Sequence, residues 1–184
     1  MNSNKVTLKH IAFLRGINVG GHHKAPMADL KKVLEQLGFE NITTLLNSGN
    51  VIFDAKNSNI ESLEELVSKH LEKTFGFPIP TIIRNAKTIQ QLYKGTPFKD
   101  ITIHKDIRLY VSFLKKDTQT KLDLPWKSAD NAFRIIAKSD KTILSILDLS
   151  FSKTPKAMNN LEKLYGKNIT TRNWKTIARI ANKL

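Results

Sequence analysis

The sequence predicts an α+β protein with two ferredoxin-like (α-β plait) units in tandem and a C-terminal helical extension. Residues 1–84 alternate short apolar runs with segments of helical periodicity in the order β-α-β-β-α-β, which is the ferredoxin-like order. Residues 85–184 repeat this order more loosely, without evident sequence identity to the first half. A chain of 184 residues is long enough for two small domains. We therefore place the first unit at 1–84, and the second unit with the C-terminal helix at 85–184.

The sequence of the first unit contains clear signals for where its helices begin and end. Pro26 suits the first turn of a helix, and Gly38 and Gly76 suit the ends of two helices. Ser58 and Glu61 have the spacing of a capping box. Strands are expected over 9–14, 42–46, 51–53 and 79–84, and helices over 26–37 and 58–75. Pro80 in the last of these strands predicts that it lies at a sheet edge.

The second unit has weaker signals. We expect at most a short helix within 117–127, between the first two long strands of this half. The other predicted elements are a linking helix over 88–94, strands over 107–114, 132–137, 142–149 and 169–171, and helices over 154–165 and 173–183.

The stretch LRGINVGGHHKAPMADL, residues 14–30, is the main candidate for a site. It places glycines and polar side chains between a strand and a helix that lacks Ser, Thr, Asp or Asn directly before Pro26. In a ferredoxin-like unit this loop shares an edge with the turn at 47–50. Backbone N–H groups, amides and cations gathered there suit a phosphate or a carboxylate. The predicted anion-binding residues are Arg15, Gly16, Asn18, Gly20, Gly21, Lys24, Ser48, Gly49, Asn50, Arg172 and Asn173.

A simpler interpretation is that these glycines only form tight turns. Their spacing matches neither a P-loop nor a dinucleotide-binding fingerprint. Ser48 lacks the setting of a nucleophile elbow, and no carboxylate pair suggests acid–base catalysis. The sequence therefore identifies no catalytic residue and leaves open whether the protein is an enzyme.

The C-terminal segment adds a second cationic region. Arg172, Lys175, Arg179 and Lys183 recur at spacings of three and four, opposite a stripe that contains Trp174. This face is either solvated or in contact with phosphate. Arg172 at a helix N-terminus is unfavourable unless an anion lies nearby, and Trp174 is expected to be a core anchor.

The formal net charge of +14 is unevenly distributed. Residues 1–84 contain 10 Lys and Arg against 8 Asp and Glu, whereas residues 85–184 contain 20 against 8. A basic second half suggests nucleic-acid binding as the alternative to a small anionic ligand. Aromatic residues, which RNA-binding sheets of this class display, are missing from 142–149. A non-catalytic structural or interaction module is the third possibility.

The composition excludes several kinds of site and partner. The absence of cysteine excludes disulfides and cysteine-bound zinc, and no apolar run approaches the length of a membrane span. We expect a cytoplasmic protein with no membrane partner and no cofactor. We expect no metal either, because the adjacent His22 and His23 have no evident third ligand. The oligomeric state is not predicted.

Three motifs together resemble a known family. They are LRGINVGG followed by Lys24, Met27 and Leu30, then NSGNVIF from Asn47, and TTRNW from Thr170. This combination resembles the bacterial family catalogued as domain of unknown function 1697. The resemblance implies a duplicated ferredoxin-like architecture with a C-terminal helical extension, and it implies no activity.

Overall fold

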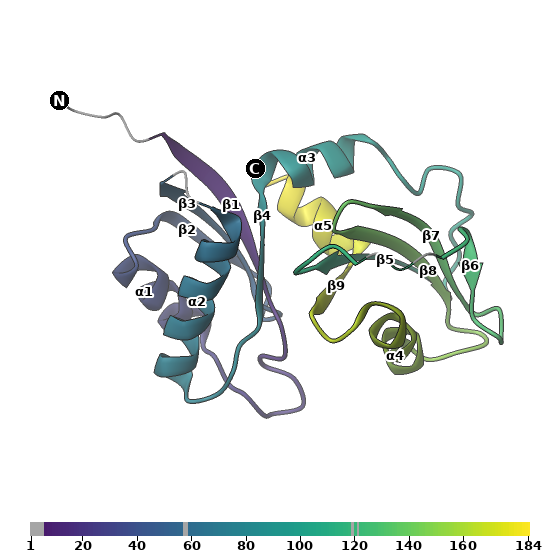
Figure 1. Cartoon of the computed structure of the whole chain (residues 1–184), viewed down its shortest axis with the longest axis horizontal. Coiled ribbons are helices and arrows are strands. Elements are labelled where there is room, and N and C mark those ends of the chain that lie inside the picture. The colour runs from purple at the N-terminus through teal and green to yellow at the C-terminus, as the bar shows by residue number, and fades with distance from the viewer. Residues whose placement is uncertain (1–5, 57–58, 119, 121) are drawn as a thin grey trace. The chain divides into compact units, whose positions relative to one another are not determined.

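The computed structural model describes residues 6–56, 59–118, 120 and 122–184. The chain divides into two compact units, one extending to Gln91 with Leu184 added, the other formed by Leu92–Lys183 (Figure 1). Each unit is built on one antiparallel sheet, and the described residues form five helices. The protein is therefore of the mixed α/β class.

The first unit has a four-stranded sheet in the order β2-β3-β1-β4. Its elements are β1 (Thr7–Leu14), α1 (Met27–Gln36), β2 (Glu40–Leu45), β3 (Asn50–Lys56), α2 (Ile60–Phe75), β4 (Thr81–Asn85) and α3 (Ala86–Lys94), the last of which continues past Gln91. Strand β3 is antiparallel to both β1 and β2, which places it between them. Strand β4 lies at the edge, as the proline before it predicts.

The core of the first unit lies between the sheet and helices α1 and α2, which cover the same face (Figure 1). Alternate β1 residues Ala12 and Leu14 point into this layer, as do Val51 and Phe53 of β3. The helices contribute Leu30, Leu34, Val67 and Leu71, which are almost completely buried. The apolar residues that alternate along the strands and those that recur every 3.6 residues along the helices are therefore buried in one layer.

The N-termini of helices α1 and α2 are capped differently. Asn59 caps α2, because its Oδ1 accepts hydrogen bonds from the backbone N–H groups of Glu61 and Ser62. The predicted capping residue Ser58 lies outside the described residues. Helix α1 has Pro26 at its N-cap and no side-chain cap, which confirms the expectation from the sequence.

The second unit has a five-stranded sheet in the order β6-β7-β8-β5-β9. Its elements are β5 (Ile107–Leu114), β6 (Trp126–Lys127), β7 (Phe133–Ser139), β8 (Thr142–Asp148), α4 (Thr154–Tyr165), β9 (Ile169–Asn173) and α5 (Trp174–Ala181). Helix α4 packs on one face, where its Leu161 and Tyr165 share a core with Leu147 of β8, whereas α5 packs against β5 and β9 on the other (Figure 1).

The expectation of four strands in the second unit is wrong. Between β5 and β7 the described residues contain no helix, only the two-residue strand β6, which extends the sheet. The segment has too few apolar residues at helical spacing, and Pro125 interrupts it. The strand expected over 169–171 is also corrected, because β9 continues through Asn173, so Arg172 lies on this strand and not at the N-terminus of the last helix, which begins at Trp174.

Among the described residues, none of the helices combines the length and the apolar character that crossing a membrane requires.

Candidate functional site

The glycine-rich loop and the turn after β2 lie side by side in the first unit, as predicted. The Asn18 amide donates to the carbonyl oxygens of Ala25 and Asn47, at 3.1 and 3.0 Å. Its Oδ1 accepts from the Ala25 N–H at 2.9 Å. The Leu14 N–H also donates to the Gly49 carbonyl at 2.8 Å. Asn18 therefore uses both its amide hydrogens and its oxygen to fasten the two segments together.

The predicted site residues of the turn also hold it in place within the fold. The buried Asn50 amide donates to the Leu45 carbonyl at 3.2 Å and to the Ser48 hydroxyl at 3.0 Å. A Cβ on Gly49 would lie 2.8 Å from the Leu14 Cβ, so only glycine permits this approach. The NSGN motif therefore has a structural role in packing the turn against β1.

The remaining loop residues are more open. Gly20 and Gly21 have positive φ, and the turn closes through a hydrogen bond from the His22 N–H to the Val19 carbonyl. Gly16 also has positive φ and is exposed, and Arg15 is half-buried, with its N–H donating to the Pro80 carbonyl at 2.9 Å.

A cavity of about 370 Å³, which we call the rim pocket, opens at the start of α1. Its basic side chains are Lys24 and His22, and its remaining lining is Asn18, Gly21, Ala25, Pro26, Met27 and Asn47. Arg15, Gly16, Gly20 and the Ser48–Asn50 turn residues do not line it. Of the predicted site residues, only Asn18, Gly21 and Lys24 line this pocket, and the hydrogen-bonding groups of Asn18 and Asn50 are used within the fold.

Arg172 is not part of an exposed cationic face. It lies on β9, is buried, and donates to the Thr170 hydroxyl at 2.8 Å and the Thr171 carbonyl at 2.9 Å. Burial lowers the pKa of its guanidinium to about 10. The neighbouring Asn173 caps α5, because its Oδ1 accepts from the Lys175 N–H at 2.9 Å. Both residues therefore shape the junction between β9 and α5.

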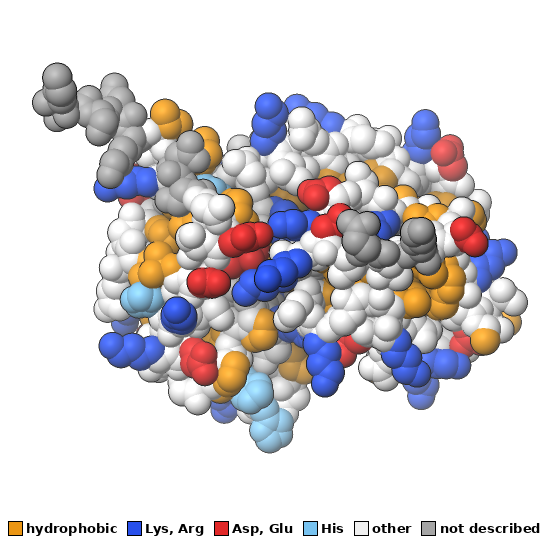
Figure 2. Space-filling model, in the orientation of Figure 1, with side chains coloured by type: hydrophobic (Ala, Val, Ile, Leu, Met, Phe, Trp, Pro, Cys, Tyr) orange, Lys and Arg blue, Asp and Glu red, His pale blue; other side chains and the backbone are white. Residues whose placement is uncertain are grey.

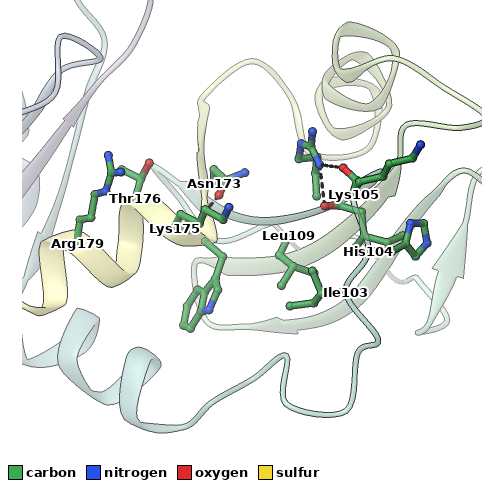
Figure 3. Close-up of a pocket in the computed structure, with 11 residues that line it drawn as sticks. Ile103, His104, Lys105, Leu109, Asn173, Lys175, Thr176 and Arg179 are labelled. Carbon is green, nitrogen blue, oxygen red and sulfur yellow. Dashed lines mark hydrogen bonds between the residues drawn. The ribbon is translucent and has the colours of Figure 1, made fainter.

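A larger cavity of about 530 Å³ opens beside this junction in the second unit (Figure 3). We call it the α5 pocket. Its walls are the start of α5 and the segment leading into β5, and it is lined by Ile103, His104, Lys105, Ile107, Arg108, Leu109, Asn173, Trp174, Lys175, Thr176 and Arg179. Every ionisable side chain in this lining is basic. No Asp or Glu is among the lining residues, although His104 lies 4.0 Å from the Asp106 carboxylate.

The basic residues of the α5 pocket have different roles. Lys175 and Arg179, one helical turn apart, are exposed on α5, and within the described parts of the chain neither makes an ion pair. Arg108 donates to the Lys105 and Ile107 carbonyls, at 2.6 and 3.1 Å, and so holds the opposite wall. The charged ends of Lys105 and His104 point away from α5 (Figure 3). Lys175 and Arg179 are therefore the cations best placed for a ligand.

The floor of the α5 pocket is apolar and aromatic. Ile103 is 65% exposed, and Leu109 lies beside it in Figure 3. Trp174 is half-buried, with its ring centroid 5.8 Å from that of Tyr93 and 5.2 Å from that of Phe98. Trp174 is thus both anchored, as expected from the sequence, and part of the cavity wall.

The basic side chains visible on one face of the molecule do not form one continuous patch (Figure 2). On the face shown in Figure 2, blue side chains occur at several separate places, with acidic side chains between them. Two lysines of the second half also form ion pairs with aspartates. Lys138 contacts Asp117 at 2.6 Å, and Lys156 contacts Asp130 at 2.7 Å. These contacts lower the pKa of both carboxyl groups. The α5 pocket and the rim pocket both contain basic side chains without acidic ones, and the α5 pocket contains more of them.

The two units share a junction motif that the sequence analysis did not recognise. Arg84-Asn85 ends β4 and Arg172-Asn173 ends β9. Each arginine donates to the carbonyl of the residue before it, and each asparagine accepts the N–H of a lysine two residues later. The strands pair with β1 and β5 in the same way, as Arg84 faces Ile11 and Arg172 faces Val111. This shared Arg-Asn-x-Lys framework is structural in both units.

The two junctions differ at the positions that line the α5 pocket in the second unit. Ala86 and Gln91 stand in the first unit where the second has Trp174 and Arg179, and Leu8 stands in the place of Arg108. Sequence reasoning included Lys175 and Arg179 in a cationic face, but it missed Lys105 and Arg108. An alignment of the two junctions in the sequence could have distinguished the residues that both units share from those that line the pocket.

Comparisons with known proteins support the resemblance found from the motifs. A family model described as "Protein of unknown function (DUF1697)" matches residues 8–138. The chain is also similar to a solved structure, the conserved bacterial protein SP0830 from Streptococcus pneumoniae, with a TM-score of 0.69 and 22% identity. This match covers 96% of the present chain and 98% of the other. At this identity the likeness concerns the fold alone. A comparison with curated proteins gives no match.

Proposed function

Because the chain belongs to the family of proteins of unknown function that this model describes, DUF1697, we propose its function from its own geometry: it binds a small phosphate-bearing anion in the α5 pocket. The observation that carries the proposal is the lining, in which Lys175 and Arg179 face a cavity of about 530 Å³ without a neighbouring carboxylate in its wall. Exposed cations without acidic partners favour an anionic ligand, because charge-assisted hydrogen bonds to phosphate are strong.

The internal comparison of the two units supports this choice. The Arg-Asn-x-Lys framework that both units share holds the strand–helix junction, so it needs no ligand to account for it. Trp174, Arg179 and Arg108 occur at this junction only in the second unit. We also propose that both units are variants of the ferredoxin-like fold, since the orders β2-β3-β1-β4 and β7-β8-β5-β9 correspond strand by strand.

The rim pocket is the second candidate for the same activity. It is favoured by Lys24 and by the start of α1, where no side chain caps the first N–H groups. It ranks behind the α5 pocket because the polar side chain of Asn18, which lines it, already bonds within the fold. Asp29 in the first turn of α1 also disfavours an anion there.

One titration distinguishes the two pockets. Isothermal calorimetry with pyrophosphate should show binding to the wild type. Lys175→Ala and Arg179→Ala should each weaken it by roughly tenfold, since one charge-assisted bond contributes about 1.5–3 kcal/mol. The exposed Lys24→Ala is the matched control and should bind as the wild type does. The reverse pattern would assign the anion to the rim pocket, and no heat with pyrophosphate or phosphate would contradict both assignments.

A further inference from the structure

The α5 pocket joins two chemically different surfaces. Its charged part is formed by Lys175 and Arg179 on one helix, whereas its floor is formed by Ile103, Leu109 and Trp174. A bare phosphate would use only the first part. The cavity of about 530 Å³ is within the range of small-molecule pockets, and a single inorganic anion would fill only a fraction of it. The apolar floor therefore favours a ligand with an apolar, preferably planar, group attached to its phosphate.

Trp174 is held in place for such a contact. Tyr93 meets its ring at an interplanar angle of 37°, and Phe98 packs against it edge-on at 68°. Phe98 is buried, so the indole rests on a fixed aromatic support and still contributes to the pocket wall. An aromatic wall beside cations is the arrangement with which proteins bind a base and its phosphate together.

We propose that the ligand of the α5 pocket is a nucleoside phosphate, with its base against Trp174 and its phosphate at Lys175 and Arg179. This assignment rests on the proposed anion binding and makes it more specific. The cavity provides one aromatic wall, which suits one base. A mononucleotide therefore fits the site better than a nucleic-acid strand, for which bases stack on successive aromatic side chains.

The test uses the intrinsic fluorescence of one tryptophan. The chain contains two, and Trp126 on β6 packs against Phe133 and is not part of this pocket. Trp126→Phe leaves Trp174 as the only indole. Adenosine 5′-monophosphate, ribose 5-phosphate, adenosine and inorganic phosphate are titrated into this protein, with calorimetry alongside to detect binding that causes no quenching.

Adenosine 5′-monophosphate should quench the Trp174 emission and bind about tenfold or more tightly than ribose 5-phosphate, because base stacking adds to the affinity. In a second variant, Trp174→Leu, this advantage should disappear while the affinity for ribose 5-phosphate is kept. If Trp174→Leu fails to fold, the comparison of the four ligands on the Trp126→Phe protein decides alone.

The unfavourable outcomes are distinguishable. If ribose 5-phosphate and phosphate bind as tightly as adenosine 5′-monophosphate, the nucleoside assignment is overturned and the anion site stands. If none of the phosphates binds, the proposed function fails as well. Affinity for a single-stranded oligonucleotide that rises with its length beyond one nucleotide would overturn the mononucleotide in favour of nucleic-acid binding.

Discussion

Single side chains decide much of how the first unit holds together, and the buried His10 is one whose titration should make the stability of this unit depend on pH. This residue lies on β1 and is 1% exposed, with its ring stacked on Phe53 at a centroid distance of 5.6 Å. Burial lowers the pKa of the imidazole below its ordinary value of 6.5, and a hydrogen bond with the Leu8 backbone and the nearby Asp54 carboxylate oppose this only in part.

The sign of the pH dependence follows from proton binding. Between the lowered pKa of folded His10 and the unfolded value near 6.5, the unfolded chain binds more protons than the folded one. The contribution of His10 to stability is therefore complete above pH 6.5 and is lost as the pH falls through the folded pKa. We expect the melting temperature to drop more steeply below pH 6.5 in the wild type than in His10→Phe.

Circular dichroism melts from pH 7.5 to pH 5 provide the measurement. His22→Gln, at an exposed loop position, is the matched control and should follow the wild type. A His10→Phe protein with an unchanged pH slope would show that another group causes the loss of stability.

At the scale of elements, side chains close the exposed edge of the first sheet. Strand β4 has no neighbour beyond it in that sheet. The Ile83 N–H donates to the Glu64 carboxylate of α2 at 2.8 Å, and the Arg84 guanidinium donates to the Ile83 carbonyl at 2.8 Å. Glu64 and Arg84 are both buried, with 3.8 Å between their charged groups. Such contacts remove backbone groups that another strand could pair with.

Removing Glu64 should therefore be costly. We expect Glu64→Ala to lower the free energy of unfolding by about 3–5 kcal/mol, because it breaks a buried ion pair with Arg84 and removes the acceptor of the Ile83 N–H. Glu64→Gln should cost less, since its amide oxygen can still accept from Ile83. Urea denaturation provides the measurement, and Glu65→Ala, the exposed neighbour on α2, should stay within about 0.5 kcal/mol of the wild type. Equal effects at positions 64 and 65 would contradict this role.

At the scale of the whole molecule, the excess of positive charge is the dominant property. Thirty Lys and Arg stand against sixteen Asp and Glu, and most of the excess lies in the second half. Net charge of one sign destabilises a compact state by self-repulsion, and salt screens this repulsion over about 10 Å at 0.1 M.

Added salt should therefore stabilise this protein. We expect the melting temperature to rise by about 2–4 °C between 20 and 300 mM NaCl, which for a chain of this size corresponds to about 1 kcal/mol. A variant with four exposed lysines of the second unit replaced by glutamine, Lys116, Lys127, Lys153 and Lys163, should melt higher at low salt and respond less to NaCl. A melting temperature that falls with NaCl would indicate that attractive ion pairs outweigh the repulsion.

The fold was largely predictable because its signals are local. The run 107–114 is observed as β5 without change, and the boundaries of α2 and α4 agree with their glycine stop signals. Apolar periodicity and turn residues act over a few positions, so they can be seen in one sequence. The prediction missed the two-residue strand β6 within 117–127 and the last two residues of β9, where the local pattern is weak and strand pairing with β7 and β5 decided the outcome.

The sequence by itself determined most of the strands and helices, and that the loop after the first strand lies beside the turn at 47–50. The tertiary structure decided what the polar residues of these segments do. Asn18, Asn50 and Arg172 resemble ligand-binding residues in a sequence, yet each bonds within the fold. Lys105 and Lys175, by contrast, line one cavity although they are far apart in the chain. Periodicity describes neighbours along the chain, whereas hydrogen-bond partners and cavity walls depend on contacts between distant segments, which only the packed structure defines.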